Sequence, residues 1–261
     1  MIVRQPGDGT MILVNQTDHA KLSGIFAAHW GNARFATPGS RLSMVRAACF
    51  HDNGWHRYET APLYDATEQS SPSFFQVPTS QEQLDEFGAA IDWLTGIDPY
   101  AGLLISRHRT GLYRNRYEAV TQPVSVSRTR NDPRLDGFVA RYEALQQRQL
   151  ESFDKARFAR DYQLLQFWDL LSLALCVREP REEIFEPVPT SFEGDGGGVR
   201  MTMTPLGEGR ISLDPYPFDV PGVEGGYMYR QVPRAFADEA AFRFAWFGAE
   251  PRLARFVFVP G

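Results

Sequence analysis

The sequence is poor in cysteine and has no arrangement of cysteines that binds a structural metal. Cys49 and Cys176 are its only two cysteines among 261 residues, and no CxxC motif is present. A disulfide-rich secreted domain and a zinc finger are therefore both excluded. Because both cysteines fall within expected helices, the sequence predicts two buried free thiols in a cytoplasmic protein.

The chain also lacks a long apolar run and an excess of basic residues. Its most apolar segment, Leu170 to Val177, is too short to cross a bilayer, and Met1 to Thr10 has no apolar signal core. Lys and Arg number 27 against 32 Asp and Glu, which gives a formal net charge of −5. Because a nucleic-acid backbone needs a basic face, we expect neither a nucleic-acid polymer nor a membrane as partner. The oligomeric state is left open.

What the chain does contain is enough apolar material for a substantial core, with 43% hydrophobic residues. Apolar residues recur at helical spacing through the first two thirds of the chain, where we expect helices at 18–30, 41–53, 80–95, from residue 99, 132–150 and 154–177. Shorter runs typical of strands follow, at 199–204, 210–213, 227–232, 242–246 and 255–259. The glycine tract at 194–198 lacks the Lys and Ser/Thr of a phosphate-binding loop and is interpreted as a turn.

These patterns predict an α+β fold in two parts. Residues 16–178 form a mostly α-helical domain, and a small antiparallel β-sheet is packed on it as a β subdomain. That sheet is built from the N-terminal hairpin (1–15) and the C-terminal segment (183–261), because a two-stranded hairpin is only marginally stable alone. Between the helices, residues 55–79 form a long irregular segment, which we expect to cover the functional site with Tyr64, Phe74 or Phe75.

Histidine and aspartate side chains fall on apolar faces of four separate expected helices. They are His19, the adjacent pair His51 and Asp52, His108, and Asp169. A carboxylate on such a face costs several kcal/mol unless it is paired or binds a metal. Each residue has an ordinary alternative, as a hydrogen-bonded core histidine or an aspartate paired with an arginine. One shared site for a divalent Mn, Fe, Zn or Ni ion explains all five together.

The order of these residues resembles the HD-domain superfamily of metal-dependent phosphohydrolases, over residues 16–177. The resemblance rests on His51-Asp52-x-Gly54 together with a preceding His, a later His and a final Asp. It implies an all-helical core, hydrolysis of phosphate esters such as nucleotides, and a divalent metal held by His19, His51, Asp52 and Asp169. More narrowly, the Gln-x-x-His start, the His-Asp-x-Gly-Trp core and the Asp-Leu-Leu-Ser end resemble a small bacterial family of uncharacterised function.

Departures from the superfamily pattern shape the expected chemistry. Many catalytic members carry Lys where Trp55 stands, and two-metal members offer two further histidines where this chain has His108. One metal is therefore expected rather than two. In a hydrolase, Asp52 is a ligand that also orients the attacking water, and His108 completes a second metal or acts as general acid. Arg107 and Arg109 either contact a small anionic substrate or are ordinary surface arginines.

The sequence thus predicts a metal-dependent hydrolase of a phosphate ester that uses metal-activated water. Two alternatives stay open. A non-catalytic metal-binding or regulatory module is favoured by Trp55 in the place of Lys. A di-iron oxygenase on an HD fold needs a sixth ligand, for which the sequence offers His29 or His56.

Overall fold

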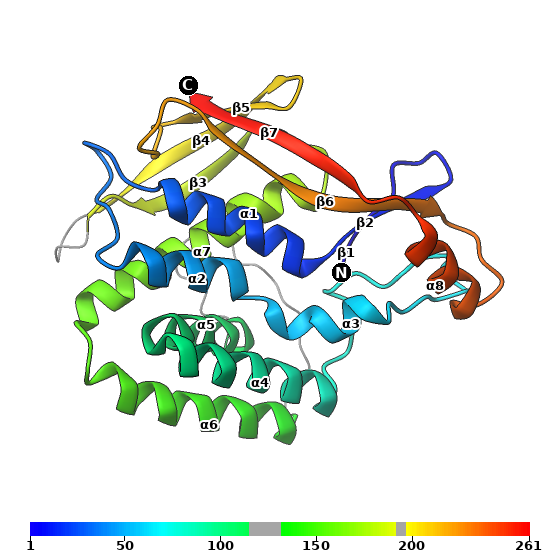
Figure 1. Ribbon diagram of the computed structural model, residues 1–261, viewed down its shortest axis with the longest axis horizontal. Coiled ribbons are helices and arrows are strands. Elements are labelled where there is room, and N and C mark those ends of the chain that lie inside the picture. Colours follow the sequence, from blue (N-terminus) through cyan, green and yellow to red (C-terminus); the bar gives the residue numbers. More distant parts are fainter. Residues whose placement is uncertain (115–131, 192–196) are drawn as a thin grey trace.

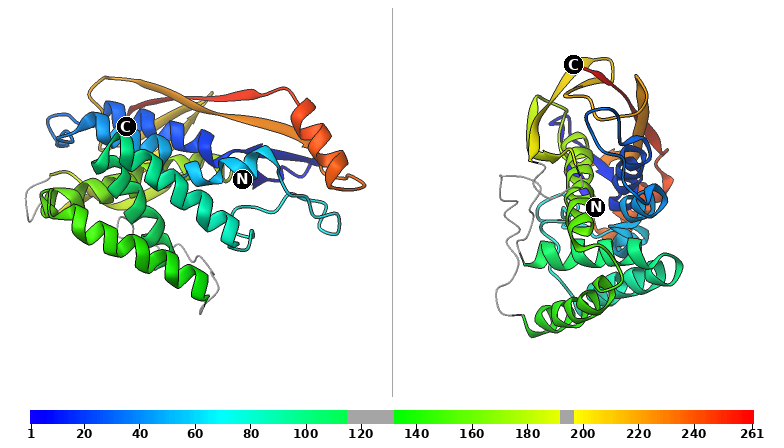
Figure 2. Two further views of the ribbon diagram at one scale, coloured as in Figure 1. Left: turned by 60° about the horizontal axis from the view of Figure 1, so that its bottom comes forward. Right: turned by 90° about the vertical axis from the view of Figure 1, so that its left-hand side faces the viewer.

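The computed structural model describes residues 1–114, 132–191 and 197–261, and places a curled sheet over a stack of helices (Figure 1). Helices α1 and α7 lie next to the sheet, and α4, α5 and α6 lie on the side away from it (Figure 2). The expected connection at 125–131 and residues 194–196 of the glycine tract fall outside the described residues. Within the described part, no helix is both long and apolar enough to cross a membrane.

The helices begin largely where the sequence places their caps. Side chains of Ser80, Asp98, Asp132 and Asp154 each accept a hydrogen bond from a backbone N–H in the first turn that follows. The helices are α1 (Gln16–His29), α2 (Arg41–Phe50), α3 (His56–Thr60), α4 (Gln81–Ile97), α5 (Pro99–Tyr113), α6 (Pro133–Leu150), α7 (Lys155–Cys176) and α8 (Glu239–Gly248), with a 3₁₀ turn at Asn53–Trp55.

The start of α1 differs from the expected helix at 18–30. The helix begins at Gln16, and the side chain of its N-cap Asn15 makes no capping bond. The buried carboxylate of Glu59, on α3, instead accepts hydrogen bonds from the backbone N–H of Gln16, from that of Thr17 and, at 2.6 Å, from the Thr17 hydroxyl. A carboxylate here also opposes the positive end of the helix dipole. The segment after the His-Asp pair therefore caps the helix that carries His19.

Within the residues that the structure describes, the sheet has seven strands in the order β1-β2-β6-β7-β5-β4-β3. The predicted pairing of the N-terminal hairpin with a C-terminal strand is confirmed, because β2 runs antiparallel to both β1 and β6. The prediction of a small, wholly antiparallel sheet is wrong, since β7 enters between β6 and β5 and runs parallel to β5. The strands are β1 (Ile2–Arg4), β2 (Thr10–Val14), β3 (Glu183–Pro189), β4 (Gly198–Gly207), β5 (Arg210–Asp214), β6 (Val223–Pro233) and β7 (Arg252–Pro260).

The expected strand at 242–246 is also wrong, because these residues lie in α8. The Asp238 side chain accepts a hydrogen bond from Ala241 N at 2.8 Å and starts the helix. Phe242 and Trp246, four residues apart, form its buried face. Aromatic residues at alternate positions favour a strand, but the cap and the i, i+4 spacing of the buried residues are typical of a helix.

One continuous core joins the helices to the sheet. Its buried side chains include Leu22 and Phe26 of α1, Leu171 of α7, and Met201 and Phe258 of the sheet. The Tyr227 hydroxyl of β6 donates to the carbonyl oxygen of Leu175 on α7, at 3.0 Å. The helical and β parts predicted as two units therefore share their hydrophobic interior.

A smaller second cluster lies beneath α8 and receives part of the long segment expected over the functional site. Tyr64 stacks on Phe242 with ring centroids 5.1 Å apart, and its hydroxyl donates to the carbonyl oxygen of Arg234. Phe74 packs instead edge-on against Trp55. This segment therefore spreads its aromatic side chains between α8 and the turn after the His-Asp pair.

Asp161 on α7 is a buried carboxyl group with an unusual pKa. The Tyr100 hydroxyl donates to its Oδ2 at 2.6 Å, whereas Oδ1 has no hydrogen-bond partner among the described residues. Burial raises the pKa of Asp161 from 3.8 to about 6, although the Tyr100 hydrogen bond and the nearby Arg157 oppose this shift. Because the folded pKa exceeds the unfolded one, its contribution to stability is complete below pH 4 and is lost as pH rises through 6.

We therefore expect Asp161→Asn, which cannot ionise, to be more stable than the wild type at pH 7.5, by about 3 kcal/mol at most. The difference should shrink towards pH 4, where the wild-type carboxyl group is also neutral. Urea unfolding at both pH values measures it, with Glu224→Gln as a control that removes an exposed carboxylate. An equal difference at both pH values would contradict the assignment.

Candidate metal centre

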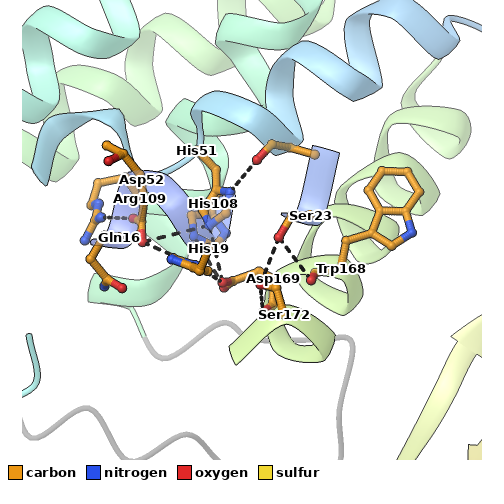
Figure 3. Close-up of polar contacts among 12 residues, drawn as sticks. Gln16, His19, Ser23, His51, Asp52, His108, Arg109, Trp168, Asp169 and Ser172 are labelled. Atoms are coloured by element: carbon orange, nitrogen blue, oxygen red, sulfur yellow. Dashed lines mark hydrogen bonds and ion pairs between the residues drawn. The ribbon is translucent and has the colours of Figure 1, made fainter. Parts of the chain in front are cut away.

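Three of the five histidines and two aspartates converge at one buried point between helices (Figure 3). His19 comes from α1, His108 from α5 and Asp169 from α7, while His51 and Asp52 follow directly on α2. All five side chains are buried. We call these residues the His–Asp cluster. The sequence predicted each of them, although Asp169 lies more than a hundred residues after His51.

The Nε2 atoms of the three histidines all face carboxylate oxygens. Asp169 Oδ1 lies 3.1 Å from His19 Nε2 and 3.3 Å from His51 Nε2, and Asp169 Oδ2 lies 3.8 Å from His108 Nε2. Asp52 Oδ2 lies 3.8 Å from the Nε2 atoms of both His19 and His51. Neighbouring imidazole rings meet edge to face, with centroids 5.0–5.2 Å apart.

This spacing suits a metal ion. Two overlapping sets, His19 with His51 and Asp169, and His51 with Asp52 and His108, each hold their ligand atoms within 4.8 Å of one another. Ligand atoms about 2.0–2.2 Å from one ion are themselves about 3–4 Å apart. The buried His and Asp groups can therefore hold a metal ion, and imidazole with carboxylate suits a first-row divalent metal.

His51 is prepared for a ligand by its other ring nitrogen. Its Nδ1 donates to the carbonyl oxygen of Ala48 at 2.8 Å, whereas the buried Nε2 makes no hydrogen bond. Such a bond to the backbone fixes the ring and aims Nε2 into the site. An orphaned, buried Nε2 between two carboxylates is the observation in this structure that best fits a metal.

The local backbone explains how two adjacent residues reach one site. A helix through residue 53 was expected, but α2 ends at Phe50, His51 is its C-cap, and Asp52 leaves the helical conformation at φ −111° and ψ 19°. Adjacent side chains on a continuous helix point about 100° apart. Asp52 thus lies just beyond the end of α2, and its Oδ2 is 3.8 Å from the Nε2 atoms of both His19 and His51.

The electrostatics leave both carboxylates charged. Burial opposes ionisation of Asp169, but the charge of the nearby His51 and the hydrogen bond with His19 hold its pKa well below its usual range. Burial also opposes ionisation of Asp52, yet His51 and Arg109 lower its pKa. For His51, burial is outweighed by Asp169 and Asp52, which raise its pKa to about 9, whereas burial lowers the pKa of His108 to about 3. A cation held here would be bound by two anionic carboxylates and would compete with the His51 proton.

The two arginines beside His108 have different surroundings. Arg109 is buried, and its Nη2 donates to Asp52 Oδ1 at 2.7 Å. Arg107 lies instead with its guanidinium carbon 5.7 Å from the centroid of the Tyr162 ring, at the wall of a separate cavity. They diverge because residues two positions apart on a helix point about 200° apart. Of the two arginines expected to contact substrate, Arg109 is therefore the hydrogen-bond partner of Asp52, and Arg107 lines a cavity.

Other residues singled out in the sequence lie away from the His–Asp cluster. His29 Nδ1 is 3.2 Å from Asp219 Oδ1 at the far end of α1, and His56 is exposed at the start of α3. Neither therefore supplies the sixth ligand that a di-iron centre requires. Trp55 is buried against Phe74 and Phe87, so the position where many HD-domain enzymes carry Lys belongs to the core.

Two supporting residues could not be recognised from the sequence. Phe87 on α4 lies under the Arg109 guanidinium, whose carbon atom is 3.4 Å from the ring centroid. Glu59 caps α1, as described above. Phe87 resembles any apolar residue of an amphipathic helix, and Glu59 resembles any surface carboxylate. The fold alone reveals their partners.

Comparison with known proteins places this centre within one family. Residues 1–234 match the family described as a protein of unknown function, DUF3891, and the match includes every member of the His–Asp cluster. No curated protein and no solved structure matched the chain. Because the matched region covers most of the 261 residues, the chain belongs to the DUF3891 family.

Proposed function

We propose that the protein is a metal-dependent hydrolase of a small phosphate ester, with its divalent ion held by the His–Asp cluster. The observation that carries this proposal is the convergence of three imidazoles and two carboxylates around the orphaned His51 Nε2. The order of these residues along the chain, which resembles that of HD-domain phosphohydrolases, also supports it. Mn, Fe, Zn and Ni all suit this mixture of nitrogen and oxygen ligands.

Each protein group has a defined part in this proposal. A divalent ion here supplies a water of lowered pKa and polarises a phosphoryl oxygen. Asp169 and Asp52 contribute the negative charge that holds the ion, while the Ala48 carbonyl keeps His51 oriented. Arg109 holds Asp52 ionised and fixes which of its oxygens faces the histidines. His108 is a further nitrogen ligand, with its Nε2 facing Asp169 Oδ2.

A separate cavity, with lining residues on α5 and α7 but none from the His–Asp cluster, favours an anionic ligand. It has a volume of about 360 Å³ and is lined by Arg107, Lys155, Tyr162 and Glu143 among others, and cavities of this size take small molecules. Tyr162 and Asp169 are seven residues apart on one face of α7, about 10 Å along the helix axis. Two cations against one carboxylate favour an anion, with Arg107 rather than the already paired Arg109 as its contact.

A matched pair of histidine variants on α1 tests the proposal. His19→Gln removes a cluster ligand, whereas His29→Gln changes a histidine paired with Asp219 at the other end of the same helix. Protein loaded separately with Mn(II), Fe(II), Zn(II) or Ni(II) is assayed for phosphate release from p-nitrophenyl phosphate and from nucleoside mono-, di- and triphosphates. We expect at least one metal and substrate pair to be turned over, with activity lost on chelation and at least 100-fold lower in His19→Gln.

Other outcomes identify the alternatives. Metal binding without turnover of any phosphate ester would make the protein a binding or regulatory module. Oxygen consumption by the iron-loaded protein would make it an oxidative enzyme. Equal activity in His19→Gln and His29→Gln would show that the His–Asp cluster is not the active site.

A further inference from the structure

We infer that the Arg109 guanidinium acts as a built-in cation that occupies one oxygen of Asp52 and thereby limits the centre to a single metal ion. The inference rests on the proposed metal centre and adds what determines its stoichiometry. Asp52 Oδ1 accepts from Arg109 Nη2 at 2.7 Å, and Oδ2 faces His19 and His51. The carboxylate thus already spans a permanent cation and the proposed ion position.

The need for such a device follows from the ligand count. The cluster forms two overlapping sets of ligands that share His51, so it has more metal-type atoms than one tetrahedral ion uses. In two-metal hydrolytic sites the ions lie about 3.5–4 Å apart, and a carboxylate with both oxygens available can bridge them. Here Asp52 Oδ1 is not available, because Arg109 occupies it.

Arg109 is suited to this role because its charge is fixed and its position is constrained. Unlike histidine or lysine, arginine is not deprotonated in proteins. Its guanidinium carbon lies 3.4 Å from the centroid of the Phe87 ring and 5.7 Å from that of Tyr113, and the residue is 2% exposed. A second divalent ion on Asp52 Oδ1 would meet this charge at close range in a buried environment, where repulsion is strong.

Phe87 is in turn placed by Gly54, from the same turn that supplies Asp52. A Cβ atom added to Gly54 would lie 2.1 Å from Phe87 Cδ1. The turn after α2 therefore contacts both Arg109 and the ring on which it lies. Asp52 accepts a hydrogen bond from the Arg109 guanidinium, and Gly54 packs against the Phe87 ring. We assign Phe87 and Gly54 as positioning residues for Arg109.

The test is the number of metal ions bound per chain. Wild type, Arg109→Met and Arg109→Lys are dialysed to equilibrium against Mn(II) and analysed for metal and protein. Arg46→Met is the matched control, because it breaks an Arg–Asp pair with Asp98 that is outside the centre. We expect about one ion per chain in the wild type, Arg109→Lys and Arg46→Met, and about two in Arg109→Met. Electron paramagnetic resonance should then show a spin-coupled Mn(II) pair in Arg109→Met alone.

The outcomes separate this inference from the proposed function. One ion in a folded Arg109→Met protein, or two in the wild type, overturns the role of Arg109 and leaves the metal centre standing. Two ions in Arg109→Lys show that charge at this position is not what limits binding. No ion in any variant overturns the proposed metal centre itself. Circular dichroism monitors folding, and Arg109→Gln, which keeps a donor towards Asp52 without the charge, replaces the methionine variant if that one is unfolded.

Discussion

Asp169→Asn is expected to lose metal binding by more than about 100-fold, because even residues that only support metal ligands are worth 10–100-fold in affinity. Asp169 is the one member of the cluster whose two oxygens together face all three histidines. The amide has nearly the same shape but no negative charge to hold a divalent ion. Isothermal titration with Mn(II) or Zn(II) measures the loss.

Asp161→Asn is the matched control for this experiment. It makes the same chemical change on the same helix, two turns before Asp169, at a carboxyl group bonded to Tyr100 rather than to the cluster. Its metal affinity should equal that of the wild type. Retention of tight binding by a folded Asp169→Asn protein would remove Asp169 from the ligand set and would contradict the proposed centre.

Gly54→Ala is expected to destabilise the protein by about 1–3 kcal/mol, as overpacking of a well-packed core does. The added methyl group would meet three atoms of the Phe87 ring within 2.7 Å. Phe87 is 2% exposed and lies between Gly54 and Arg109, so it has little room to move. Urea denaturation of wild type and variant measures the change.

Gly96→Ala provides the contrasting control on α4. A Cβ atom there has no neighbour within 4 Å, so the helix should gain about 0.5–1 kcal/mol from the better helix former. Combining Gly54→Ala with Phe87→Leu should restore part of the stability that Gly54→Ala loses, because the shorter side chain frees the space. No recovery in the double variant would show that the Phe87 ring is not what opposes the methyl group.

Local signals predicted much of the helical layer. Capping residues such as Ser80 and Asp98 act within one turn of the chain, so the sequence carries them openly. The metal-type residues were likewise recognisable because charged and imidazole groups on apolar faces need an explanation. The same argument predicted a partner for Asp169 on another helix. His19 Nε2 lies 3.1 Å from Asp169 Oδ1, although nothing in the local sequence of Asp169 identifies His19 as its neighbour.

What the sequence could not supply depends on distant pairing. The sequence suggests that Arg109 contacts substrate. The fold instead pairs it with Asp52, 57 positions away. Gly54 reads as a helix terminator, yet α2 has already ended at Phe50, and its small size is explained by the Phe87 ring. Strand order is non-local in the same way, because no short segment indicates that β7 pairs with β5.

The insertion of β7 between β6 and β5 also has a consequence for assembly. Without β7, the sheet falls into two separate three-stranded halves, β1-β2-β6 and β5-β4-β3, with no hydrogen bonds between strands to join them. β7 is the last of the described strands in the sequence. The edges of β6 and β5 therefore stay open until β7 pairs with them. Until then, these open edges are templates for association with other chains. Residues 252–260 therefore join the two halves into one sheet. Pairing of β7 covers the open edges of β6 and β5, and with them the surfaces at which the chain can associate with others.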